Sequence, residues 1–163
     1  MGMTPISSLP YPELTGPNNP PADFEALANE LDPLVKPQIQ SYAVAWTQSG
    51  GSGLAIGNGT LEGKFVQTGR LVAYRILLVR GSTTNLGTAT YQFSLPVAAD
   101  TFQQAGGNSI MSVGGLFKQG AVRFSSSTTC AVMRPDDTGL GPSSFTWASG
   151  DWIAISGTYL AAV

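Results

Sequence analysis

The stretch Arg70-Leu71-Val72-Ala73-Tyr74-Arg75-Ile76-Leu77-Leu78-Val79-Arg80 decides the fold class of this chain. Side chains of a strand point alternately to two faces, and here both faces are apolar. One face holds Val72, Tyr74, Ile76 and Leu78, and the other holds Leu71, Ala73, Leu77 and Val79. A strand that is apolar on both faces has to be covered on both. We therefore expect the first face in a core, and the second against a neighbouring subunit or a helix near the N-terminus.

Further strands are predicted on both sides of this stretch, separated by short turns rich in Gly, Ser, Thr and Asn. They are expected at residues 42–47, 60–67, 90–95, 109–113, 116–124, 128–133, 144–147 and 152–160. Many short strands at close spacing are typical of a sandwich. The sequence thus predicts an all-β domain over residues 41–163, an antiparallel β-sandwich that is jelly-roll-like in strand count, whose strand order stays open.

Residues 1–40 have a different composition, because they hold eight of the eleven prolines. Proline has no backbone N–H for a ladder and fixes φ, so this segment is predicted to be an extended arm. Asn19-Pro20-Pro21 is typical of a helix start, and Asp32-Pro33 of a helix end. The arm is therefore expected to contain one short α-helix at about residues 20–32.

The predicted helix carries an apolar stripe made of Phe24, Leu27 and Leu31. A helix of about ten residues is marginal alone in water, so this stripe has to pack on something. Three partners stay open: the β-domain of the same chain, a short dimeric or trimeric helix bundle, and a groove on a different protein. The three residues are thus candidates for docking or assembly.

Charge and hydropathy exclude several classes of partner. The 163-residue chain has eight basic and ten acidic residues, and the basic ones are scattered, so no nucleic-acid partner is expected. No apolar run approaches the ~20 residues that span a bilayer, so no membrane insertion is expected. The start Met1-Gly2-Met3-Thr4-Pro5 lacks a signal-peptide pattern, which predicts synthesis in a cytoplasm.

The residues needed for most hydrolytic chemistry are missing from the sequence. The chain has no histidine and one cysteine, Cys130, which excludes Ser-His-Asp triads and thiolate metal clusters and favours a small core residue. The glycine-rich segments 50–53 and 57–59 lack the ending of a phosphate loop, and Asp136-Asp137 has an ordinary turn composition. We therefore predict a protein that is not an enzyme, with no catalytic residue, metal or cofactor.

Two further groups of side chains have alternative roles. Trp46, Trp147 and Trp152 are candidates for stacking on sugar rings, but each falls in or at the end of a predicted strand, which favours the core or a subunit interface. Arg75 falls among apolar residues, which predicts an ion pair that is buried or at an interface.

Several stretches, taken together, carry a resemblance to a known class of protein. In the arm they are Leu9-Pro10-Tyr11-Pro12, Gly16-Pro17-Asn18 and Ala22-Asp23-Phe24-Glu25-Ala26-Leu27-Ala28. In the β-domain they are Trp46-Thr47 and residues 57–72 and 145–159. The first group resembles the N-terminal arm, and the second the β-domain, of small virion proteins of tailed phages that infect actinobacteria.

The resemblance implies a structural component of the virion exterior, made in the host cytoplasm. Its residues 1–40 would attach to phage capsid or tail proteins, and residues 41–163 would face outward. Related virion sandwiches usually form trimers, which implies a homotrimer closed by Leu71, Ala73, Leu77 and Val79. The lack of a long shaft favours a capsid decoration or head-fibre protein. The alternative is a minor tail, tail-fibre or baseplate protein whose β-domain binds a host cell-surface glycan.

Overall fold

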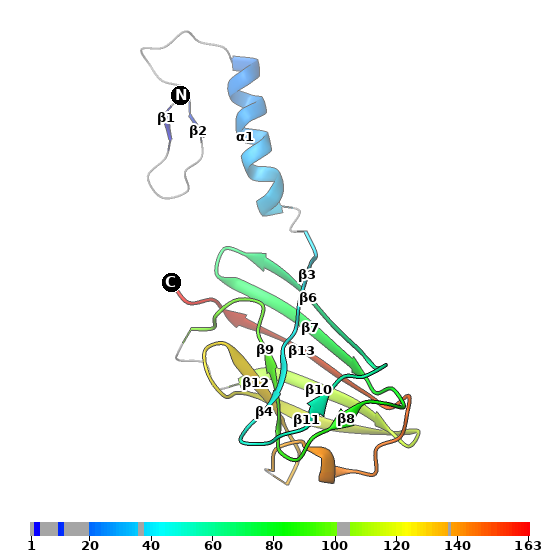
Figure 1. The fold of residues 1–163 in the computed structure, drawn as a ribbon. Helices are drawn as coiled ribbons and strands as arrows, with labels where there is room; N and C mark the ends of the chain where they lie inside the picture. Colours follow the sequence, from blue (N-terminus) through cyan, green and yellow to red (C-terminus); the bar gives the residue numbers. More distant parts are fainter. Residues whose placement is uncertain (1, 4–9, 12–19, 36–37, 101–104, 137) are drawn as a thin grey trace. The chain divides into compact units, whose positions relative to one another are not determined.

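The computed structural model describes residues 2–3, 10–11, 20–35, 38–100, 105–136 and 138–163 (Figure 1). The chain divides into two compact units, Met1–Gln38 and Ile39–Val163. We call them the N-terminal unit and the β-unit.

The N-terminal unit contains the helix α1 (Pro20–Val35) and a pair of two-residue antiparallel strands, β1 (Gly2–Met3) and β2 (Pro10–Tyr11). The helix begins where the sequence predicts, but it ends at Val35 and not at residue 32. Proline disfavours the α conformation of the residue before it, and inside a helix it removes one hydrogen bond and crowds the carbonyl four residues back, at a cost of about 3 kcal/mol. This cost does not forbid a helix, and α1 continues two residues past Pro33. Most of the predicted extended arm, residues 4–9 and 12–19, lies outside the described residues.

Within the described ranges, the main structure of the β-unit is a nine-stranded antiparallel sheet with the order β3-β6-β7-β13-β10-β11-β12-β9-β4. Its strands are β3 (Gln40–Tyr42), β4 (Trp46–Gln48), β6 (Thr60–Thr68), β7 (Leu71–Val79), β9 (Tyr91–Ser94), β10 (Ala105–Val113), β11 (Leu116–Phe124), β12 (Thr129–Met133) and β13 (Trp152–Leu160). The short strands β5 (Leu54–Ala55) and β8 (Asn85–Leu86) pair separately. The predicted antiparallel β class is confirmed.

Two strand predictions are wrong. The strand predicted at residues 42–47 is interrupted at residues 43–45, and its two ends belong to the separate strands β3 and β4. The sequence also predicts a strand at residues 144–147, but the chain there forms the 3-10 helix η1 (Pro142–Ser144) and then an irregular segment. Pro142 fixes φ at the first position of that turn, and the Ser144 hydroxyl accepts a hydrogen bond from the Gly141 N–H at 2.9 Å. Local turn chemistry therefore overrides the apolar pattern that follows it.

The two edges of the sheet are joined by one segment of the chain. β3 pairs with β6 at one edge and β4 pairs with β9 at the other, although only residues 43–45 separate them. Between them, the Ser94 N–H donates to the Ala45 carbonyl oxygen at 2.9 Å, and the Ala45 N–H donates to Ser94 Oγ at 2.8 Å. The sheet therefore curls on itself, and its concave side encloses the core (Figure 1).

The core is built from the faces that alternation predicts. On β7, the predicted core face is confirmed, since Val72 and Ile76 are fully buried and Tyr74 and Leu78 nearly so. From the other strands the core receives Tyr91, Phe93, Met111, Val122, Val132, Ile153, Ile155 and Tyr159. Cys130 is also fully buried, in agreement with its predicted role as a small core residue.

β10 and β13 approach each other closely at glycines. β10 has an irregular register between Ala105 and Gly107, and the Tyr74 hydroxyl donates to the Gly106 carbonyl oxygen at 3.0 Å. A Cβ atom at Gly157 would lie 1.8 Å from that same carbonyl oxygen. Any side chain at this position would therefore push the two strands apart.

We expect Gly157→Ala to lower the free energy of unfolding by about 2 kcal/mol, because the added methyl group overpacks a backbone contact. Urea denaturation of the full chain measures this change. The exposed neighbour Thr158 provides the control, since Thr158→Ala should change stability by less than about 0.5 kcal/mol. Equal unfolding midpoints for the two variants would contradict the close approach.

Candidate functional site

The side of β7 that faces away from the core is the first candidate site. Leu71 is 51% exposed, Ala73 is exposed, and Leu77 and Val79 are half-buried. The sequence predicts that these residues lie against a neighbour. In the single chain Leu71 and Ala73 are open to solvent and Leu77 and Val79 partly so, which leaves room for such a neighbour.

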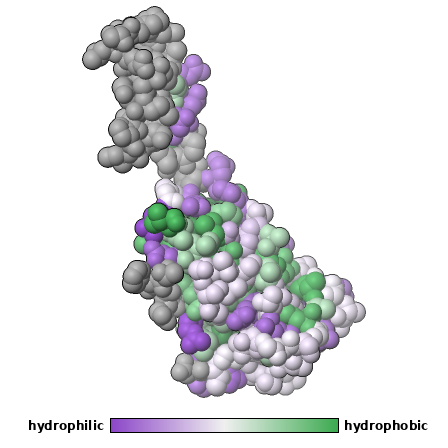
Figure 2. Space-filling view, turned by 60° about the vertical axis from the view of Figure 1, so that its left-hand side comes forward, coloured by the Kyte–Doolittle hydropathy of each residue, from purple (hydrophilic) through white to green (hydrophobic). Residues whose placement is uncertain are grey.

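Strand pairing extends this surface across five more residues of β10, β11 and β13. Trp152 lies opposite Val79, and Ile110 lies opposite Ala154. The Phe117 ring, 73% exposed, contacts Trp152 edge-on, with ring centroids 6.1 Å apart. We call this surface the outer face; it consists of Leu71, Ala73, Leu77, Val79, Ile110, Phe117, Trp152, Ala154 and Leu160. Figure 2 shows apolar patches (green) among near-neutral residues on the visible side of the β-unit.

Two cations lie side by side on the strands that carry the outer face. Arg75 of β7 is directly opposite Lys64 of β6, and both side chains are exposed. The buried ion pair proposed for Arg75 is therefore wrong, because this position faces outward; an ion pair across an interface stays a prediction. Like charges in directly opposed positions repel each other. A covering surface with a carboxylate at this place would relieve the repulsion.

The three tryptophans pack against other rings, in agreement with the core or interface role that the sequence favours. Trp46 and Trp147 pack against the buried Tyr91, with ring centroids 5.3 Å and 6.5 Å from it. Trp152 is half-buried beside Phe117. The exposed aromatic ring of this region is thus Phe117, which sequence reasoning missed. Its place near the start of the predicted strand 116–124, two residues after Gly115, was the available signal.

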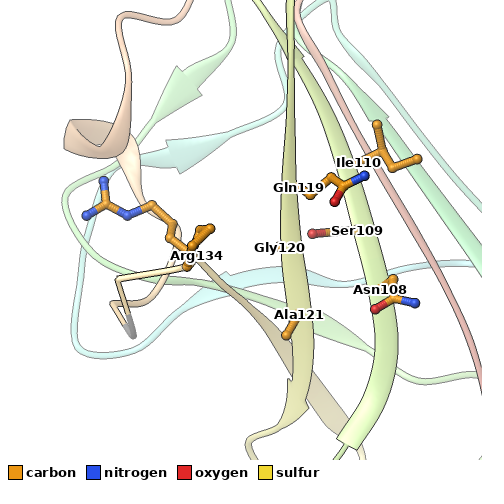
Figure 3. A pocket seen from close by; sticks show the side chains of 8 residues that line it. Asn108, Ser109, Ile110, Gln119, Gly120, Ala121 and Arg134 are labelled. Atoms are coloured by element: carbon orange, nitrogen blue, oxygen red, sulfur yellow. The ribbon is translucent and has the colours of Figure 1, made fainter.

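A groove lies beside the first half of β11. In the described part of the chain, β12 pairs with β11 only from Ala121 to Phe124, so residues 116–120 have β10 as a partner on one side alone. A cavity of about 470 Å³ at this place is lined by Asn108, Ser109, Ile110, Gln119, Ala121 and Arg134, among others (Figure 3). An adjoining cavity of about 460 Å³ shares Gln119 and Arg134 and adds Phe117 and Phe145. We call the two together the β11 groove.

The Arg134 side chain forms hydrogen bonds within the loop that follows β12. Its Nε donates to Asp136 Oδ1 at 3.2 Å and to Thr138 Oγ1 at 2.9 Å, and its Nη1 donates to the Ser144 carbonyl oxygen at 3.3 Å. Its Nη2 also pairs with the Asp136 carboxylate. The hydrogen bond from the Thr138 hydroxyl, helped by Arg134, lowers the pKa of Asp136. The positive charge of Arg134 is therefore paired with the carboxylate of Asp136 in the same loop.

Buried groups that titrate belong to the core and not to a reactive centre. Burial raises the pKa of the Cys130 thiol to about 11, so the thiol is protonated at neutral pH. Burial also raises the pKa values of Tyr42, Tyr74 and Tyr91. Among the described residues, no three His, Cys, Asp or Glu side chains gather closely enough to hold a metal ion. In the same part of the chain, no helix has the length and apolar character needed to cross a membrane.

The predicted docking residues of α1 lie within its described side chains, residues 24–31. Phe24 is 70% exposed, Leu31 is 36% exposed and Leu27 is half-buried. Which of the three proposed partners covers this stripe stays a prediction.

Comparison of the chain with protein-family models, with curated proteins and with solved structures finds no match. The resemblance to phage virion proteins therefore rests on the sequence stretches themselves. What the outer face and the β11 groove do has to follow from their own chemistry.

Stability is expected to fall above about pH 9. The folded chain holds the Cys130 proton up to a pKa of about 11, whereas the ordinary value is 9.0, so the unfolded chain releases this proton first. Urea unfolding midpoints should decline between about pH 9 and pH 11, and Cys130→Ala should remove roughly 2 kcal/mol of that decline. Midpoints that do not depend on pH would contradict the buried, protonated thiol.

Proposed function

We propose that this protein is a non-enzymatic structural component of a tailed-phage virion, most consistent with a capsid decoration or head-fibre protein. The N-terminal unit attaches to capsid or tail proteins, and the β-unit stands on the virion exterior. The protein is made in the host cytoplasm and needs no cofactor. The observation that carries this proposal is the outer face, where a curled sheet leaves large apolar side chains in contact with water.

The outer face supports assembly with further copies of the chain. Monomeric proteins rarely expose large apolar patches without a partner for them. The outer face holds two such groups of side chains, one towards each end of β7, on either side of Arg75 and Ser156. Leu71, Ala73, Leu77 and Val79 lie along its central strand, and Phe117 and Trp152 extend it. We infer a homotrimer in which this face of each copy packs against its neighbours.

The finer description of the fold belongs to the same proposal. The curl brings strands from the two ends of the sheet face to face around the core, which supports a two-layer, jelly-roll-like sandwich. The proline-rich composition of residues 1–19 supports an extended arm that reaches a docking partner.

The alternative is a minor tail, tail-fibre or baseplate protein. It is favoured by the β11 groove, because a virion protein that contacts a host needs a place to bind it. The first proposal requires only that the protein attaches to the virion. The alternative requires in addition that the β-unit binds a host ligand.

Self-association should depend on the outer face. Ala73→Glu places a carboxylate on its exposed central strand, and the cost of burying that charge should prevent close packing of copies. By light scattering after size exclusion, we expect three times the 16.9 kDa chain mass for the unmodified protein and the single-chain mass for the variant. Ser49→Glu, at an exposed position directly after the edge strand β4, should remain trimeric. A monomer in all three cases would contradict the trimer.

Attachment should depend on the N-terminal unit. A shortened chain that begins at Ile39 keeps every residue of the core and should unfold cooperatively in urea. It should remain oligomeric but fail to co-sediment with phage particles that lack the protein, whereas the full chain should bind them. Particle binding by the shortened chain would contradict attachment through the N-terminal unit.

A further inference from the structure

A row of polar side chains crosses the outer side of the sheet between the two apolar groups of the outer face. Pairing of β6, β7, β13 and β10 places Lys64 opposite Arg75, Arg75 opposite Ser156, and Ser156 opposite Asn108. All four side chains are exposed, and strand alternation directs them to the same side of the sheet. We call these four residues the polar row; the strands that carry it are neighbours in the sheet (Figure 1).

The position of the polar row means that a copy packed on the outer face has to cover it. Along β7, Leu77 lies on one side of Arg75 and Ala73 lies on the other. A copy that packs against both apolar groups therefore passes over the residues between them. Lys64 and Arg75 then lose contact with water, and a cation removed from water opposes binding unless a carboxylate pairs with it.

In the described part of the single chain, no carboxylate pairs with either cation of the polar row. Neither Lys64 nor Arg75 forms an ion pair or a side-chain hydrogen bond with a described residue. Because the two cations are directly opposed, each also makes it harder to bury the other. A copy that covers them therefore has to bring a negative charge to this place.

Of the described carboxylate side chains in the β-unit, Glu62 is the one that remains available. The others already have partners: Asp100 pairs with Arg70, Asp136 pairs with Arg134, and the buried Asp151 accepts two backbone hydrogen bonds. Glu62 is exposed, and its side chain makes no ion pair or hydrogen bond with a described residue. It is therefore the carboxylate of the β-unit that a second copy can offer.

Glu62 lies on the same side of the sheet as the polar row. It stands opposite Leu77, one diagonal step from Arg75 across β6 and β7. Diagonal positions of this kind are roughly 7 Å apart. The surface thus carries a negative and a positive site next to each other, and the same surface of a second copy can match each with its opposite.

We propose that Glu62 of one copy pairs with Arg75 and Lys64 of the next copy, and that this pairing determines how the copies fit together. The inference rests on the proposed homotrimer. A closed ring gives each copy two different neighbours, so Glu62 faces one of them and Arg75 faces the other. Glutamate and arginine then alternate around the symmetry axis, and each covered charge has a partner of opposite sign. Glu62 is thus the partner for the interface ion pair that the sequence predicts for Arg75.

Exchanging the two charges of the full chain tests this pairing. Glu62→Arg adds a third cation beside Lys64 and Arg75, and it should raise the protein concentration needed for half assembly by about tenfold or more. Glu62→Arg combined with Arg75→Glu keeps the net charge of the unmodified chain and again offers opposite charges to a neighbour. This double exchange should restore the trimer. Light scattering after size exclusion, over a series of protein concentrations, measures both effects.

The matched control adds the same charge to the same strand but away from the pairing. Gln67 is an exposed residue of β6 that stands opposite the core residue Val72, so Gln67→Arg should assemble as the unmodified chain does. Unchanged assembly of Glu62→Arg, or failure of the double exchange to restore the trimer, would overturn the pairing and leave the homotrimer in place. A monomeric unmodified chain would overturn both.

A competing source of carboxylates has a different signature. Glu25 and Glu30 of α1 are also exposed, and α1 of another copy would bring them to the polar row if it covered the outer face. In that case Glu25→Gln with Glu30→Gln should dissociate the trimer and Glu62→Gln should not, which would overturn the role of Glu62. The proposed pairing gives the opposite result. Neither outcome bears on particle attachment, which co-sedimentation of the shortened chain tests separately.

Discussion

The pairing of one extended segment with both edges of the sheet is the constraint on which the β-unit depends. β3 completes the edge at β6, and β4 completes the edge at β9, while the Ala45–Ser94 hydrogen bonds hold the segment between them. An open sheet edge exposes a row of unpaired N–H and C=O groups, which favours aggregation. Using a single segment for both edges forces the sheet to curl, and the curl creates the concave side that the core fills.

Closure at the two edges also decides what remains exposed. It places β7 and β13 in the middle of the sheet, so the second apolar face of β7 points outward with nothing from the described β-unit over it. The β11 groove arises from a different local event. β12 ends at Met133, and Pro135 has no N–H with which to continue the ladder, so β11 extends past its neighbour. The two candidate surfaces thus arise from different features of the sheet, although they share Ile110 and Phe117.

The candidate site was only partly accessible from the sequence. Alternation alone assigned Leu71 and Leu77 to a second apolar face, because side-chain direction in a strand depends on local spacing. The exposed Phe117 and the polar row could not be found in this way. Their importance comes from residues that are distant in sequence: Trp152 packs beside Phe117, and the pairing of β7, β13 and β10 aligns the polar row. Which side chains stand next to one another across strands is a property of long-range pairing.

The sequence by itself determined the antiparallel β class, the core face of β7 and the start of α1 at Pro20, because period-two alternation and proline chemistry act over a few residues. It did not determine the strand order, the end of α1 or the turn at residues 142–144. The tertiary structure alone decided that β3 and β4 close opposite edges, and that Tyr91 is the ring against which Trp46 and Trp147 pack. Those outcomes depend on which strands meet, and the free energy of such contacts is shared between segments far apart in the chain.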